Sequence, residues 1–491
     1  MKTVATFAAG ALVASVARAQ VVQWDIHRRQ TETKLTRRQD GTVTEVITNE
    51  KLKGGYFASC TVGTPGQNLT LQLDTGSSDI WVPSSSSSVC QQTSNSQGCT
   101  LGSFDESDSK SFSVVGENEF SISYVDGSHS KGDYIAETFE IGGATLTNLT
   151  MGLGINTDIP YGLVGVGYVA SEAIVDSTRS TSSAYDNLPL LMQKQGLIAT
   201  NAYSLWLNDL DASTGSILFG GIDTEKYHGD LTRINIYKDS RSGVFSSFTV
   251  ALTSVEASSS SGTDSLAAEF PIPVILDSGT TFSYLPTELA EQIWQEVGAV
   301  YYDEVSLALL PCDMENSQGH FSFGFGGSGG PVINVTMDEL VLPLTSGSRS
   351  IPLPDGPNAG QAACQFGIQN FSSSSTSFLL GDTFLRSAYV VYDLVNNEIA
   401  IAPTDFNATT SNVVAFPSEG AQIPSATAAP NQAEVTQGGS LTTPSYGASG
   451  GFQDDKESAA SIPPPLDLSR IAVIGASMGL VTVGSGFFLL F

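Results

Sequence analysis

Two stretches of the chain repeat each other: Leu73-Asp-Thr-Gly-Ser-Ser-Asp-Ile-Trp-Val-Pro83 and Leu276-Asp-Ser-Gly-Thr-Thr-Phe-Ser-Tyr-Leu-Pro286. The offset is 203 residues throughout. Leu, Asp, Gly and Pro match in identity, and the hydroxyl residues match in kind. Either motif alone is as readily explained by a surface turn. The matched pair instead predicts two related lobes, each of which places one aspartate on a tight turn.

The residue types in these turns suit paired carboxylates. Two carboxyl groups about 3 Å apart cannot both ionise, so Asp74 and Asp277 would share a proton. One could then act as general base on a water molecule and the other as general acid on a carbonyl group. The glycines would let the backbone turn sharply, and the hydroxyls would bond across the turns or donate to the carboxylates. These supporting residues are Thr75, Gly76, Ser77, Ser278, Gly279 and Thr280.

The two turns resemble the active-site turns of pepsin-like aspartic proteases, and the resemblance covers roughly residues 54–403. Leu163-Val-Gly165 and Leu379-Leu-Gly381 resemble the segments that pass beside each catalytic turn in that family. The resemblance implies a mostly β, bilobal fold with a central substrate cleft, made by an N-terminal lobe (39–231) and a C-terminal lobe (232–405). It implies an endopeptidase that acts on protein or peptide substrates as a monomer, with no metal and no organic cofactor.

A hairpin follows the first catalytic turn. Asp126-Gly127 is a strong hairpin-turn signal between two strand-like runs. The hairpin corresponds to the family's flap, with Tyr124 as the flap tyrosine and Trp81 as the indole that holds it. Asp126 at the tip suggests a preference for Lys or Arg before the scissile bond, through a charge-assisted hydrogen bond. The alternative is that Asp126 only serves the turn.

Composition and the N-terminal segment indicate secretion. The chain has 21 Lys+Arg and 50 Asp+Glu, a net charge of -29, so nucleic acid is nearly excluded as a partner. Residues 1–19 are typical of a signal peptide. Residues 20–38 are basic and contain two Arg-Arg pairs, which predicts a pro-segment cleaved after Arg38; a solvated linker is the alternative.

The C-terminal residues predict a surface anchor. Residues 406–460 are rich in Ser, Thr, Ala, Gly and Pro, which is typical of a disordered, O-glycosylated stalk. Residues 461–491 resemble a GPI-anchor signal that is removed on attachment at Ser458; a plain transmembrane helix is the alternative. A stalk and anchor on such a body resemble fungal yapsin-type proteases, which implies a plasma-membrane or cell-wall location and cleavage near basic residues.

Yapsins often carry a long acidic insertion where this chain has a short polar loop between Cys90 and Cys99. That departure weakens the implied basic specificity. A second hypothesis is a cell-wall structural or adhesive protein that has lost activity, but the residues whose loss would mark such a protein are all present.

The cysteines and sequons agree with passage through the secretory pathway. In a secreted protein, cysteines are expected to pair, and we expect Cys90–Cys99 and Cys312–Cys364, with Cys60 left as a buried thiol. Five sequons predict N-glycosylation, at Asn68, Asn148, Asn334, Asn370 and Asn407.

Overall fold

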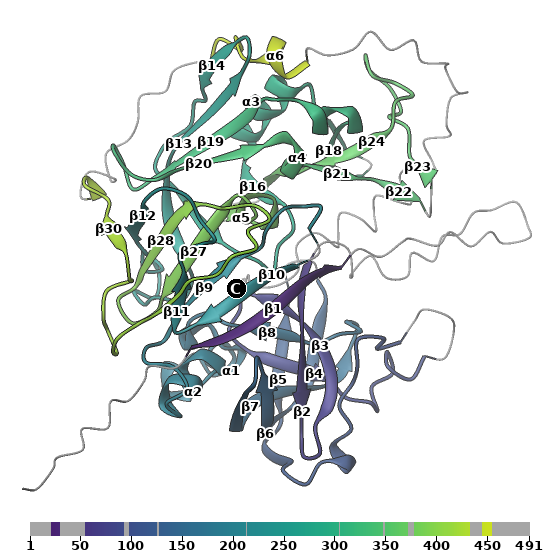
Figure 1. The fold of residues 1–491 in the computed structure, drawn as a ribbon. Helices are drawn as coiled ribbons and strands as arrows, with labels where there is room; N and C mark the ends of the chain where they lie inside the picture. The colour runs from purple at the N-terminus through teal and green to yellow at the C-terminus, as the bar shows by residue number, and fades with distance from the viewer. Residues whose placement is uncertain are drawn as a thin grey trace, which may run out of the picture.

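The computed structural model describes residues 21–29, 55–92, 98–124, 127–212, 214–303, 305–346, 349–371, 378–432 and 444–453. The predicted signal peptide, the anchor signal 461–491, Ser458 and Asp126 lie outside these ranges. Strands dominate the described residues and form two lobes, one above the other in Figure 1.

A 14-stranded sheet runs through both lobes. Strands from the two halves of the chain meet where β27 pairs with β9, so hydrogen bonds join the lobes continuously (Figure 1). The order from one edge is β30 (Ala426–Ala428), β12 (Leu231–Asn235), β28 (Glu398–Pro403), β27 (Ala388–Asp393), β9 (Ala202–Trp206), β10 (Thr214–Phe219), β1 (Val22–Arg29), β2 (Gly55–Val62), β3 (Gln67–Asp74), β8 (Leu163–Gly165), β4 (Ile80–Pro83), β7 (Ala144–Thr157), β6 (His129–Ile141) and β5 (Ser113–Ser123).

The C-terminal lobe adds a second large sheet. Its order is β20 (Val332–Thr336), β19 (His320–Phe325), β13 (Thr249–Ser259), β15 (Ile272–Leu276), β26 (Phe378–Leu380), β16 (Ser283–Pro286) and β25 (Ile368–Phe371), with β14 (Gly262–Ser265) paired to β13. A four-stranded sheet contains β17 (Val300–Tyr302), β18 (Leu307–Pro311), β24 (Ala363–Phe366) and β21 (Val341–Pro343). Two-stranded pairs join β22 (Thr345–Ser346) to β23 (Arg349–Ser350) and β11 (Gly221–Asp223) to β29 (Val413–Ala415).

The helices are short. They are α1 (Ala173–Thr178), α2 (Leu188–Lys194), α3 (Thr287–Val297), α4 (Met337–Leu340), α5 (Asp382–Leu385) and α6 (Ser449–Gln453). Within the described ranges, none of them is long and apolar enough to cross a membrane.

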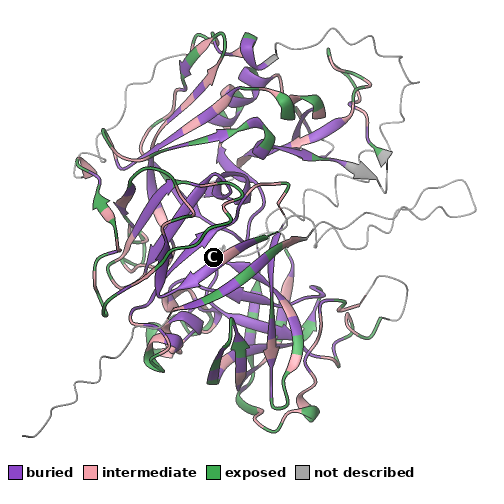
Figure 2. Ribbon diagram, in the orientation of Figure 1, coloured by how far each residue is buried: buried purple, intermediate pink, exposed green. Residues whose placement is uncertain are grey.

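The strands where the lobes meet are deeply buried. All six residues of β27 are buried, as expected for a strand covered on both faces, and Figure 2 shows the central strands almost wholly buried. The predicted mostly β fold is confirmed.

Strand β1 lies inside the predicted pro-segment, yet it is an inner strand of the large sheet. It pairs with β10 from Val22 to His27 and with β2 from His27 to Arg29. The side chains of Val22, Trp24 and Ile26 are buried. Removing such a strand would leave two unpaired sheet edges and an open core. Part of the predicted pro-segment is therefore built into the sheet, and its cleavage after Arg38 stays a prediction.

We predict that cleavage after Arg38 leaves β1 bound to the body. Peptide 20–38 should co-elute with the enzyme in native size-exclusion chromatography and separate only in denaturant. Trp24→Ala should loosen it, because a buried Trp-to-Ala change costs about 3–5 kcal/mol, whereas Gln23→Ala on the exposed face of the same strand should not. Release of the wild-type peptide in native buffer would contradict the prediction.

The predicted stalk is ordered over much of its length. β29 and β30 pair with β11 and β12, and Phe416 and Ile423 are buried. Further along, the ring of Phe452 stacks on Phe321 at 5.3 Å. The average composition of residues 406–460 is polar, so it gives no sign of these few apolar residues. Their side chains are buried against the body. The prediction of disorder is thus corrected for residues 406–432 and 444–453.

The segment 444–453 is also held by polar contacts. The buried carboxylate of Asp264 accepts hydrogen bonds from the backbone N–H groups of Ser445 (3.1 Å) and Ala448 (2.7 Å). This segment therefore docks on the end of the C-terminal lobe that carries β14 (Figure 1).

Both predicted disulfides are confirmed, Cys90–Cys99 and Cys312–Cys364. Cys60 is free and buried, as predicted, and burial raises the pKa of its thiol, which makes it unreactive. Four of the sequon asparagines are exposed, namely Asn68, Asn148, Asn334 and Asn407, and Asn370 is half-buried. Their glycosylation stays a prediction.

Candidate active site

The two aspartates occupy equivalent places in the two lobes. Asp74 is the last residue of β3 and lies opposite Gly165 of the parallel strand β8. Asp277 directly follows β15, and its backbone N–H donates to the carbonyl of Leu380 on β26 (3.1 Å). The segments predicted to pass beside the catalytic turns therefore do so, and each fixes the backbone of one aspartate.

The turns are locked together by reciprocal hydrogen bonds. The backbone N–H of Thr75 donates to Ser278 Oγ (3.2 Å), and the backbone N–H of Ser278 donates to Thr75 Oγ1 (2.9 Å). The Thr75 hydroxyl also donates to the carbonyl of Leu276 (3.0 Å). All of these groups are buried, and the predicted bonding across the turns is confirmed.

Each carboxylate is held in the same way by its own turn. Asp74 Oδ1 accepts from the N–H of Gly76 (2.8 Å), and its Oδ2 accepts from the Ser77 hydroxyl. Asp277 Oδ1 accepts from the N–H of Gly279 (2.8 Å), and its Oδ2 accepts from the Thr280 hydroxyl (2.6 Å). Both aspartates are at most 1% exposed. The predicted roles of Ser77 and Thr280 are confirmed.

Gly76 is needed for a different reason from the one the sequence suggested. Its backbone does not adopt the left-handed conformation. A Cβ atom at this position would instead lie 2.6 Å from Asp277 Oδ1. The missing side chain therefore allows the first turn to approach the carboxylate of the second.

The electrostatics favour one shared proton. Burial raises the pKa of Asp277 well above its usual range, and the adjacent Asp74 carboxyl, with which it shares a hydrogen bond, raises it further. A neutral Asp277 can donate a proton to a carbonyl oxygen while an ionised Asp74 accepts one from water. This is the chemistry of peptide-bond hydrolysis by a carboxyl pair.

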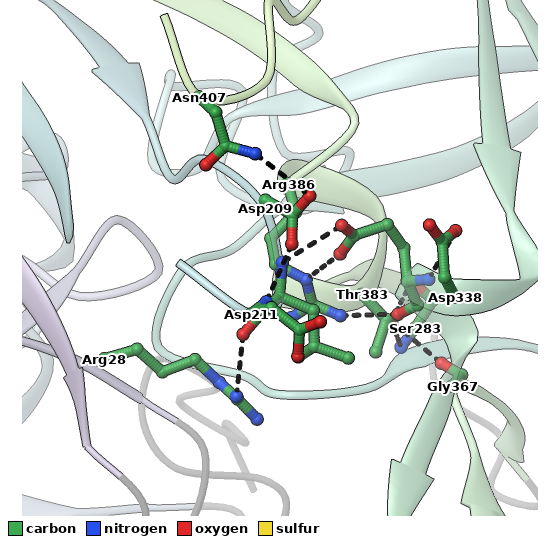
Figure 3. A network of polar contacts seen from close by, with 11 residues as sticks. Arg28, Asp209, Asp211, Ser283, Asp338, Gly367, Thr383, Arg386 and Asn407 are labelled. Atoms are coloured by element: carbon green, nitrogen blue, oxygen red, sulfur yellow. Dashed lines mark hydrogen bonds and ion pairs between the residues drawn. The ribbon is translucent and has the colours of Figure 1, made fainter. Parts of the chain in front are cut away.

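A buried ion pair supports the second turn and was not found from the sequence. The backbone N–H groups of Asp382 and Thr383 in α5 donate to the carbonyls of Thr280 (2.8 Å) and Thr281 (3.0 Å). Just after α5, the fully buried Arg386 donates to the carboxylate of Glu339 in α4 (Figure 3). The partners are 47 residues apart, so no local motif marks them.

The same close-up shows how β1 reaches this region. The Arg28 guanidinium donates to the carbonyl of Leu210 (3.2 Å), and the N–H of Leu210 donates to Glu339 (3.0 Å) (Figure 3). The cluster therefore connects β1 with the support of the second catalytic turn.

The hairpin predicted to be the flap is present, with Trp81 bonded to Tyr124 as expected; its role over the substrate stays a prediction. β5 and β6 form the hairpin, and Trp81 Nε1 donates to the hydroxyl of Tyr124 (2.7 Å). The N–H of Gly127 donates to the carbonyl of Tyr124 (2.9 Å), and Gly127 has a φ of 81°. Asp126 lies outside the described residues.

Comparisons with known proteins agree with this geometry. Residues 55–404 match the family described as eukaryotic aspartyl protease. The "Probable aspartic-type endopeptidase opsB" of Aspergillus oryzae is 39% identical over 93% of this chain and 92% of its own. The "Acid protease" of Saccharomycopsis fibuligera is 39% identical over 72% of this chain and 81% of its own.

"Secreted aspartic protease 8" of Candida albicans is 36% identical over 76% of this chain and 80% of its own. The chain therefore belongs to the eukaryotic aspartyl protease family, as a pepsin-like aspartic endopeptidase. The hypothesis of an inactive wall protein gains no support, because both catalytic turns and the flap tyrosine are in place.

We predict that Asp74→Asn and Asp277→Asn each lower kcat by about 10⁴-fold or more, as loss of a member of a catalytic unit does. Both variants should fold, because asparagine keeps the shape of the aspartate side chain and adds no buried charge. Wild-type activity should fall as pH rises through the raised pKa of Asp277. The measurements are peptide hydrolysis against pH and circular dichroism. Substantial activity in folded Asp74→Asn would refute the assignment.

Proposed function

We propose that the protein is a secreted endopeptidase, held at the cell surface by a GPI anchor, that prefers Lys or Arg before the scissile bond. The proposal rests on one observation above the others: stretches typical of targeting signals flank a body whose catalytic residues are complete. The Candida albicans relative is named a secreted aspartic protease, which supports the proposed secretion of this protein.

The anchor proposal is supported by the order of three segments. Small residues at Ser458, Ala459 and Ala460 precede a spacer that contains three consecutive prolines. The apolar stretch 471–491 follows and contains no charged residue. A GPI transamidase reads this order of small residues, spacer and apolar tail.

The basic preference is supported by the flap turn. Backbone bonds close this turn, from the N–H of Gly127 to the carbonyl of Tyr124 (2.9 Å) and from the N–H of Tyr124 to the carbonyl of Ser128 (2.9 Å). Gly127 supplies the positive φ. These bonds close the turn from residues on either side of Asp126. An acid at the tip of such a hairpin can form a charge-assisted hydrogen bond with a basic substrate residue, which supports the proposed preference.

We predict that Asp126→Thr depresses cleavage after Lys and Arg by about tenfold to a hundredfold. This corresponds to the loss of one hydrogen bond to a charged group, about 1.5–3 kcal/mol. Cleavage after Leu or Phe should be nearly unchanged. The measurement is kcat/KM on matched peptides, with Glu117→Gln, an exposed acid on the same hairpin, as the charge-matched control. An equal fall in both peptide classes would reduce Asp126 to a turn residue.

We predict that a phosphatidylinositol-specific phospholipase releases the active enzyme from intact cells. Replacing Ser458, Ala459 and Ala460 together by leucine should block attachment, because small residues are required there. Deleting residues 471–491 should give a soluble enzyme of unchanged kcat. Enzyme retained after the lipase, with peptide 471–491 still attached by mass spectrometry, would favour a transmembrane helix.

A further inference from the structure

Asp79 is a buried carboxyl group that the catalytic chemistry does not use. It lies in the same loop as Asp74, and its side chain is fully buried. Three separate segments donate hydrogen bonds to it: the hydroxyl of Tyr134 on β6 (3.2 Å), the hydroxyl of Tyr185 ahead of α2 (2.8 Å) and the N–H of Ala173 at the start of α1 (2.7 Å). The backbone carbonyl of Asp79 also accepts from the N–H of Gly165 (2.9 Å).

These contacts continue into the flap. The ring of Tyr134 packs edge-on against Phe120 of β5 at 5.4 Å, and Phe120 lies 6.4 Å from the ring of Trp81. Trp81 in turn holds the flap tyrosine, Tyr124. Both strands of the flap are thus connected to Asp79 through side chains that are all buried.

We propose that Asp79 is a positioning residue for peptide hydrolysis, which holds the base of the flap and helix α1 against the first catalytic turn. The hydrogen bonds described for its side chain go to Tyr134, Tyr185 and Ala173 rather than to the catalytic carboxyl groups. Its hydrogen bonds fix where the flap strands leave the body, so they determine how the flap tyrosine meets a bound peptide.

The surroundings of Asp79 contain acids and tyrosines. Glu172, which precedes α1, is buried; its Oε2 accepts from the N–H of Tyr185 (2.8 Å), and its Oε1 has no hydrogen-bond partner. The other titratable groups that face Asp79 are Asp176 on α1, Tyr124 on the flap, Tyr134 on β6 and Tyr185. Among the residues that the structure describes, no Lys, Arg or His forms an ion pair with either carboxyl.

Asp79 therefore positions the flap best at acid pH, where its carboxyl group is neutral. Burial without a cation raises the pKa of Asp79 to about 6 and that of Glu172 to about 10. The three donated hydrogen bonds favour the ionised form, but burial outweighs them. When neutral, the carboxyl donates to one tyrosine hydroxyl and still accepts from the other groups. Because the folded pKa of Asp79 lies above the unfolded value, the stabilisation is complete below the unfolded value. It is lost as pH rises through about 6.

The test is Asp79→Asn, since an amide has the shape and the donor-acceptor pattern of a neutral carboxyl. KM, kcat and melting temperature are measured on one generic peptide from about pH 3.5 to pH 7. At the acid end we expect KM and kcat within about twofold of wild type. Towards neutral pH, we expect KM to rise and the melting temperature to fall in wild type, and we expect both changes to be much smaller in the variant. Glu117→Gln, an exposed acid on the flap hairpin, should keep the wild-type profile.

Two outcomes would overturn the proposal. The first is an Asp79→Asn enzyme whose KM depends on pH as in wild type. The second uses Tyr185→Phe, which removes a single donor and keeps the ring. We expect this folded variant to raise KM at acid pH by about threefold to tenfold, with a smaller effect on kcat. An unchanged KM in Tyr185→Phe would show that the contacts are structural only.

Discussion

The paired hydrogen bonds between Thr75 and Ser278 are the constraint on which the site depends. Each half of the chain supplies one turn, and neither turn alone brings two carboxyl groups together. The crossed bonds set their separation, and the adjacent strands β8 and β26 hold each turn from behind. The continuous sheet through β27 and β9 keeps the halves in register, so a small buried contact determines the geometry of a large molecule.

Buried acids occur here in two kinds of environment. Burial raises the pKa of Glu339, but its ion pair with Arg386 opposes that shift and fixes the carboxylate within the architecture. Burial raises the pKa values of Asp277, Asp79 and Glu172, and neighbouring acids raise them further. Asp277 lies in a catalytic turn, and Asp79 and Glu172 lie at the base of the flap. An enzyme built in this way has both its chemistry and its flap attachment suited to acid surroundings.

The sequence predicted the parts of the site that local chemistry specifies. The repeated turns, their hydroxyls, the flap tyrosine and the disulfides all follow from motifs of a few residues. The partners of Asp79 and the pair of Arg386 with Glu339 come from distant segments with no shared spacing, so no motif marks them. The strand pattern of Val22, Trp24 and Ile26 was obscured by adjacent arginines, and the docking residue Phe452 was obscured by a polar average composition.

The docking of residues 444–453 limits how far an anchored enzyme could range. Only five residues, 454–458, lie between the docked segment and the proposed attachment at Ser458, whereas 55 residues separate Ser458 from Pro403. Five extended residues span at most about 17–18 Å. The C-terminal lobe would then lie close to the membrane. The cleft would act on substrates at a distance from the membrane comparable to the size of the enzyme. Such a short connection would bring two groups of substrates within reach: proteins on the same membrane and proteins that pass through the adjacent wall.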